Sequence, residues 1–125
     1  MACAVSAGVH AALTPEHLRE EPAAGIGFLV STVLLAALVV ALTLRPASRI
    51  ALAAAGAVLA GLLVLYAVAV TTGVPLLHPD VEPADGLGLV TKAVELVGLL
   101  AVVRLALPVR SAGRPIRLQP KGTTT

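Results

Sequence analysis

At 125 residues the chain is long enough for one domain, and its composition argues against a soluble one. Hydrophobic residues make up 58% and charged residues only 13%, whereas soluble domains carry about 25% charged residues. Phe28 and Tyr66 are the only aromatic residues, so a base-stacking surface for nucleic acid is not expected despite the net charge of +2. Cys3 is the only cysteine, which excludes an intrachain disulfide and a metal cluster made of cysteines. We therefore expect an integral membrane protein, with the lipid bilayer as its partner.

The first segment, residues 2–13, is apolar apart from Ser6 and His10. A signal peptide, a disordered N-terminus and a short membrane helix are the three alternatives. No basic residue precedes the segment, which argues against a signal peptide, and its apolarity argues against disorder. A helix of this length spans about 18 Å, a little more than half a bilayer. We expect this short helix to pack against the other spans, and its shortness suggests the hypothesis that the native gene starts upstream of Met1.

Thr14, Pro15 and Glu16 carry the signals of a new helix start. Threonine is a common N-cap, proline suits the first helical position, and an acidic residue is favourable near the positive end of the helix dipole. Pro22 would close this second, polar helix. The sequence therefore predicts a break at Thr14–Pro15 followed by an interfacial helix, so that His10 and His17 are not expected to share a helical face.

Three later apolar runs, at about 23–44, 50–72 and 87–107, are each long enough to cross a bilayer as a helix. Inside lipid the backbone must satisfy its own hydrogen bonds, which favours helices. The fold prediction is an all-α membrane protein, a four-helix bundle with a short first helix and three full transmembrane helices, over residues 1–108. The basic segment 109–125 is broken by Pro and Gly and is predicted to be a disordered tail.

The charges of the connections predict the orientation in the membrane. The tight turn between the first two full spans carries Arg45 and Arg49 and no acid, and the C-terminal tail is also basic. The loop over residues 73–86 contains three acids and no base, and the segment 16–21 is net negative. The positive-inside rule then places the basic turn and the tail in the cytoplasm. The predicted localisation is the inner membrane of a bacterial cell, multi-pass, with the C-terminus cytoplasmic.

Glu95 lies near the middle of the last apolar run, where a lone carboxylate costs on the order of 2.5–3.5 kcal/mol on insertion scales. Lys92 is three residues earlier on the same helical face, so a structural Lys92–Glu95 pair is one interpretation. Tyr66 is expected at a similar depth in the preceding span, within reach of a hydrogen bond to Glu95. The functional alternative makes Glu95 a ligand for a bound group or a proton carrier.

Histidines and acidic residues gather on the predicted outer side. Imidazole and carboxylate groups together suit a transition metal, and haem is the other cofactor that we consider. Solvated interfacial histidines without a ligand are the alternative, because the spacing forms no established metal motif. The candidate metal-binding residues are His10, His17, Glu20, Glu82 and Glu95.

Small residues four apart recur in the first two full spans, at Gly27 and Ser31, at Gly56 and Ala60, and at Ala57 and Gly61. Such spacing lets helices approach closely, which predicts packing within the bundle or within a homo- or hetero-oligomer. The sequence contains no phosphate-binding loop, Ser-His-Asp arrangement or zinc-protease motif. A protein that is not an enzyme is therefore predicted.

Two stretches of the sequence resemble a family of small bacterial four-helix membrane proteins. The first, VHAALTPEHLREEPAAGIGFL, has a His-x6-His-x2-Glu pattern formed by His10, His17 and Glu20. The second, TTGVPLLHPDVEPADGLGLVTKAVELVGLL, has a Gly-x-Pro…Glu-Pro…Glu pattern formed by Gly73, Pro75, Glu82, Pro83 and Glu95. The chain departs from the family in its truncated first helix and in the absence of a Gln within the following span. The resemblance implies a site at these residues and no particular activity.

The leading functional hypothesis is a membrane protein with an outer-face His/Glu site that binds a metal or another ligand. A structural or assembly subunit of a membrane complex is the alternative, and a small transporter is the third. The metal content of the purified protein would separate the first two hypotheses.

Overall fold

The computed structural model describes residues 1–74, 81 and 83–107. This part of the chain contains four helices and no strand. The helices are α1 (Ala2–Glu20), α2 (Pro22–Leu44), α3 (Arg49–Thr72) and α4 (Gly86–Ala106). The all-α, four-helix prediction is confirmed, and the bounds of the three long helices agree with the predicted spans to within one residue. The predicted tail lies outside the described residues, and so do Pro75 and Glu82 of the second resembling stretch.

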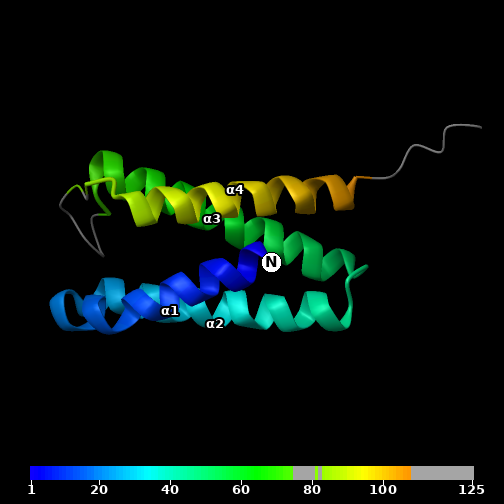
Figure 1. Ribbon diagram of the computed structural model, residues 1–125, viewed down its shortest axis with the longest axis horizontal. Coiled ribbons are helices and arrows are strands. Elements are labelled where there is room, and N and C mark those ends of the chain that lie inside the picture. Colours follow the sequence, from blue (N-terminus) through cyan, green and yellow to red (C-terminus); the bar gives the residue numbers. More distant parts are fainter. Residues whose placement is uncertain (75–80, 82, 108–125) are drawn as a thin grey trace, which may run out of the picture.

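The helices form two antiparallel pairs that pack side by side (Figure 1). α1 packs mainly on α2 and α3 mainly on α4, with smaller contacts between α1 and α4 and between α2 and α3. At one end, which we call the acidic end, α1 and α3 finish and α2 and α4 begin. Among the described residues, the charged ones at the acidic end are Glu16, Arg19, Glu20, Glu21 and Asp85. Those at the opposite, basic end are Arg45, Arg49 and Arg104 in the same part of the chain.

Local sequence signals explain where the long helices begin and end. Pro22 occupies the first turn of α2, where its missing N–H costs nothing. Ser48 caps α3 by accepting a hydrogen bond from the backbone N–H of Ala51, and Asp85 caps α4 by accepting one from Gly88. Gly73 ends α3 with a φ of 71°, a left-handed conformation that favours glycine.

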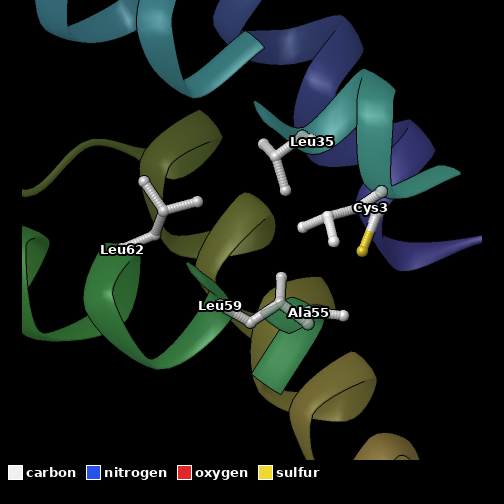
Figure 2. Close-up of a cluster of buried hydrophobic side chains, with 6 residues drawn as sticks. Cys3, Leu35, Ala55, Leu59 and Leu62 are labelled. Carbon is white, nitrogen blue, oxygen red and sulfur yellow. The ribbon is translucent and has the colours of Figure 1, made fainter. Parts of the chain in front are cut away.

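The buried apolar core is small and lies where α1, α2 and α3 meet (Figure 2). Leu35, Ala55 and Leu59 are completely buried at its centre. The cluster consists of Cys3, Leu35, Leu38, Ala55, Leu59 and Leu62. Side chains around the outside of the bundle are also apolar, as Val33, Ile50 and Val97 show with exposed fractions of 61%, 84% and 67%. Such an apolar exterior suits lipid rather than water.

Three of the helices, α2, α3 and α4, are long and apolar enough to cross a membrane. α1 is not among them, and its first residues lie against the middle of α4. A Cβ atom added at Gly98 would overlap the Cβ of Ala2. The short reach of α1 across the bundle is visible in Figure 1, where the N-terminus lies midway along the other helices. These features suit a multi-pass membrane protein with α1 packed against its spans.

The predicted break at Thr14–Pro15 is wrong, because α1 continues without interruption to Glu20 with Pro15 inside it. The Thr14 hydroxyl donates a 2.7 Å hydrogen bond to the backbone carbonyl of His10, one turn earlier in the helix. Membrane helices tolerate interior prolines when neighbouring helices and Ser or Thr side chains support the disturbed turn. The consequence is that His10 and His17, two turns apart, lie on the same face of one helix.

The small-residue positions divide into close contacts and open positions. A Cβ at Gly56 would lie 3.5 Å from Val102, so this glycine lies at the contact of α3 with α4. A Cβ at Gly27 or Gly61 would meet nothing within 4 Å. The closest approach to the backbone of another helix is at Gly25, where a Cβ would lie 2.5 Å from the backbone nitrogen of Leu18. Gly25 therefore allows α1 and α2 to lie against each other beside their short connection.

Candidate ligand-binding site

Five buried polar side chains lie on α1 and α4, and a hydrogen bond between Ser6 and Glu95 joins the two helices. Three come from α1 at intervals of four residues, which places them on one helical face. Two come from α4, also four residues apart. The five residues are Ser6, His10, Thr14, Thr91 and Glu95. A polar contact between helices is unusual in a bundle that is otherwise apolar on its inside and outside.

Glu95 is fully buried, and both of its carboxylate oxygens have partners. Lys92 Nζ lies 2.7 Å from Oε2, so the ion pair expected from their spacing is present within α4. The Ser6 hydroxyl on α1 donates a 2.5 Å hydrogen bond to Oε1. A buried charge is tolerated only when an opposite charge and further hydrogen bonds replace the hydration that the charged group loses on burial. Glu95 meets both conditions, and one of its partners comes from another helix.

The hydrogen bond of His10 determines which ring nitrogen carries the proton. Nδ1 lies 2.8 Å from the backbone oxygen of Ser6 and 3.4 Å from the Ser6 hydroxyl oxygen. A carbonyl oxygen can only accept, so Nδ1 is the protonated nitrogen. In the neutral ring Nε2 then keeps its lone pair and is free to accept a hydrogen bond or bind a metal.

His17 repeats this arrangement two turns later on α1. Its Nδ1 donates a 3.0 Å hydrogen bond to the carbonyl of Leu13, which again leaves Nε2 as the accepting nitrogen. Phe28 on α2 contacts both imidazoles, with ring centroids 4.2 Å from His17 and 5.3 Å from His10. One aromatic side chain therefore holds the two histidines in a line along the same face of α1.

Tyr66 on α3 does not form the expected hydrogen bond with Glu95. Its hydroxyl oxygen is buried and has no hydrogen-bond partner among the residues that the structure describes. The ring lies beside Lys92, whose Nζ is 5.5 Å from the ring centroid. The Ser6 hydroxyl and the Lys92 ammonium group bind the Glu95 carboxylate instead, because α1 lies next to α4 at this depth. Gly88 lies directly against the Tyr66 hydroxyl, since a Cβ there would be 3.0 Å from it.

A cavity of about 390 Å³ opens at the acidic end, between all four helices. Both imidazoles line it, as do Phe28, Tyr66 and Lys92, and its remaining walls are largely aliphatic. Glu95 does not line the cavity and lies behind Lys92 and Ser6. Pockets for small molecules have a similar size and a similar combination of apolar walls with a few polar groups. The arrangement can therefore accommodate a small molecule and offer it hydrogen-bond acceptors.

The predicted metal-binding residues are only partly brought together. His10, His17 and Glu20 all line the cavity, whereas Glu95 is separated from it. The described residues include no group of three His, Cys, Asp or Glu side chains placed to hold a metal ion. Residues seven apart on a helix have Cα atoms about 10.5 Å apart, while two nitrogens on one zinc ion lie only about 4 Å apart or less. Metal binding that involves Glu82 stays a prediction, because Glu82 lies outside the described residues.

Two residues of this site were not identified from the sequence, although both carried a signal. Ser6 is the only polar residue besides His10 in the apolar segment 2–13, and it lies one turn before that histidine. Phe28 is one of only two aromatic residues in the chain. Their roles depend on contacts between helices, which residue spacing alone does not reveal.

No protein-family model, curated protein or solved structure matches this chain.

Proposed function

We propose that this protein is a non-enzymatic membrane protein of the cell envelope that binds a small amphipathic molecule in the cavity at its acidic end. The bound molecule would place its apolar part against the aliphatic walls and its polar part against the imidazoles and the tyrosine hydroxyl. The cavity faces the outer side of the inner membrane in this proposal, and the basic end faces the cytoplasm. Arg45, Arg49 and Arg104 at the basic end support this orientation.

The observation that carries the proposal is the set of unused polar atoms around the cavity. Nε2 of His10 and Nε2 of His17 both remain as acceptors once Nδ1 has been used. The Tyr66 hydroxyl is buried without a partner in the described part of the chain. Buried polar atoms are almost always hydrogen-bonded, and an exception needs an explanation. A bound molecule that reached the Tyr66 hydroxyl would supply one, and the same molecule could donate hydrogen bonds to the two imidazole nitrogens.

The buried network next to the cavity supports the same proposal. Ionisable side chains inside a membrane are costly, and they usually mark a functional site. Here Glu95 fixes the ammonium group of Lys92, which lines the cavity, and the hydrogen bond from Ser6 fixes Glu95 in turn. The side chains around the cavity are therefore held in place before a ligand arrives, which lowers the entropy cost of binding.

The binding test uses Tyr66 as its own reporter. The chain has one tyrosine and no tryptophan, so its tyrosine fluorescence comes from a residue that lines the cavity. Protein in dodecyl maltoside is titrated with 2-phenylethylamine, 2-phenylethanol and 3-phenylpropionate, three molecules of similar size with different polar groups. At least one of them is expected to change the fluorescence saturably.

Gly27→Leu is the blocking variant, and Gly61→Leu is its control. Gly27 lines the cavity, whereas Gly61 does not line it and a Cβ at Gly61 would meet nothing within 4 Å. We expect Gly27→Leu to abolish the saturable signal and Gly61→Leu to retain it. Binding that Gly27→Leu leaves unchanged, or no saturable signal with any of the three probes, would contradict the proposal.

A further inference from the structure

We infer that the ligand of this cavity is a small organic cation, an amine with an apolar body; this inference rests on the proposed function and specifies its ligand class. The alternatives are a neutral molecule and an anion of the same size. Charge, hydrogen-bonding capacity and the aromatic side chains of the cavity each favour the cation.

The charges around the cavity are predominantly negative. Glu16, Glu20 and Asp85 line its opening at the acidic end. Lys92 is the only Lys or Arg among the described residues of the lining, and Glu95 neutralises it at 2.7 Å. Arg19 belongs to the same end of the bundle but does not line the cavity. No basic side chain of the cavity lining therefore neutralises the three carboxylates at the opening. These carboxylates attract a positively charged molecule and repel an anion.

The hydrogen-bonding groups of the cavity also match an ammonium group. Nε2 of His10 and Nε2 of His17 are acceptors, and carboxylate oxygens are acceptors as well. A protonated amine has only donors, so each of its N–H groups can meet an acceptor here. An anion has only acceptors and therefore needs donors. The donors of the cavity are limited to the Tyr66 hydroxyl and the ammonium group of Lys92, which is already paired with Glu95.

Aromatic faces and aliphatic walls complete the match. Phe28 and Tyr66 both line the cavity, and a ring face that His17 or Lys92 does not cover can attract a cation within about 6 Å of its centroid. Leu13, Leu62 and Leu65 supply apolar surface beside them. A molecule with a charged amine at one end and an apolar body at the other would satisfy both kinds of surface at once.

The test compares dissociation constants for the three probes of matched size, measured by Tyr66 fluorescence at neutral pH. Hydrogen bonds between charged groups are roughly twice as strong as neutral ones, so 2-phenylethylamine is expected to bind about tenfold tighter than 2-phenylethanol. 3-Phenylpropionate is expected to bind weakest. If 2-phenylethanol binds as tightly as the amine and Gly27→Leu blocks both, the cation inference is overturned while the proposed function stands. If no probe binds, both are overturned.

Charge variants provide an independent check. Glu16→Gln with Glu20→Gln removes two charges from the cavity opening, and Glu21→Gln removes one charge from the same end at a residue that does not line the cavity. The double variant is expected to weaken the binding of 2-phenylethylamine several-fold and to leave 2-phenylethanol unchanged. Glu21→Gln is expected to change neither by a comparable factor. Equal losses for the amine and the alcohol would count against recognition of the charge.

Discussion

Ser6 on α1 donates a 2.5 Å hydrogen bond to Glu95 on α4, and this contact joins the first helix of the chain to the last. Both residues are completely buried. The carboxylate is held on its other side by Lys92, so a charged group inside the bundle has all its close partners within protein. The bond therefore helps to hold α1 in the bundle, although α1, with 19 residues, is not apolar enough to count among the spanning helices.

Ser6→Ala is expected to destabilise the protein by about 1.5–3 kcal/mol, the usual contribution of a hydrogen bond to a charged group. The matched control is Thr43→Val, which removes an exposed hydroxyl whose partner is the carbonyl of Val39 in its own helix. Thermal unfolding in dodecyl maltoside, followed by circular dichroism, measures both variants. Equal effects of the two substitutions would show that the Ser6–Glu95 contact contributes nothing specific.

Glu95→Leu is expected to be strongly destabilising, by about 3 kcal/mol or more, because it leaves the Lys92 ammonium group without its partner in a half-buried position. Lys92→Leu combined with Glu95→Leu removes both charges, and replacing a buried pair by apolar residues is often close to neutral. Ser6 can then turn its hydroxyl to the backbone carbonyl of its own helix. The double variant should thus be clearly more stable than Glu95→Leu alone in the same unfolding assay. A double variant as unstable as the single one would mean that the pair acts through more than its charge.

Gly25→Ala is expected to destabilise the contact between α1 and α2 by about 1–3 kcal/mol, as overpacking does. The added Cβ would lie 2.5 Å from the backbone nitrogen and 2.6 Å from the Cα of Leu18, and backbone atoms cannot move aside as a flexible side chain can. Gly27→Ala, two residues later in the same helix, meets nothing within 4 Å and is expected to be neutral or slightly stabilising. A stable Gly25→Ala protein would show that α1 and α2 do not approach as closely as described.

The orientation in the membrane can be measured with single cysteines in a Cys3→Ala background, since Cys3 is the only native cysteine. A membrane-impermeant maleimide should label Glu20→Cys in intact spheroplasts, because Glu20 is exposed at the acidic end. Ala47→Cys, in the exposed turn at the basic end, should react only after the membrane is permeabilised. The reverse labelling pattern would place the cavity on the cytoplasmic side and refute the proposed orientation.

Several features follow from short-range sequence properties and were predicted correctly. Twenty or so consecutive apolar residues suffice to predict a membrane-spanning helix, because the thickness of the bilayer sets the length and lipid forces the backbone to bond to itself. The ion pair of Lys92 and Glu95 could likewise be expected, since residues three apart on a helix are neighbours whatever surrounds them. The helix boundaries depended on Pro22, Ser48 and Asp85, which act within one turn.

Only the tertiary structure decided which polar groups meet across helices. Pro15 did not break α1, Tyr66 did not reach Glu95, and Ser6 became the interhelical partner of the carboxylate. The physical reason is that α2, α3 and α4 are apolar on nearly all sides, so their sequences contain no hydrophobic stripe that would indicate which face of each helix points inward. Length and composition thus determine that the chain forms helices long and apolar enough to span a membrane, whereas the rotation and depth of each helix, and with them the cavity and its polar groups, depend on the packing of the whole bundle.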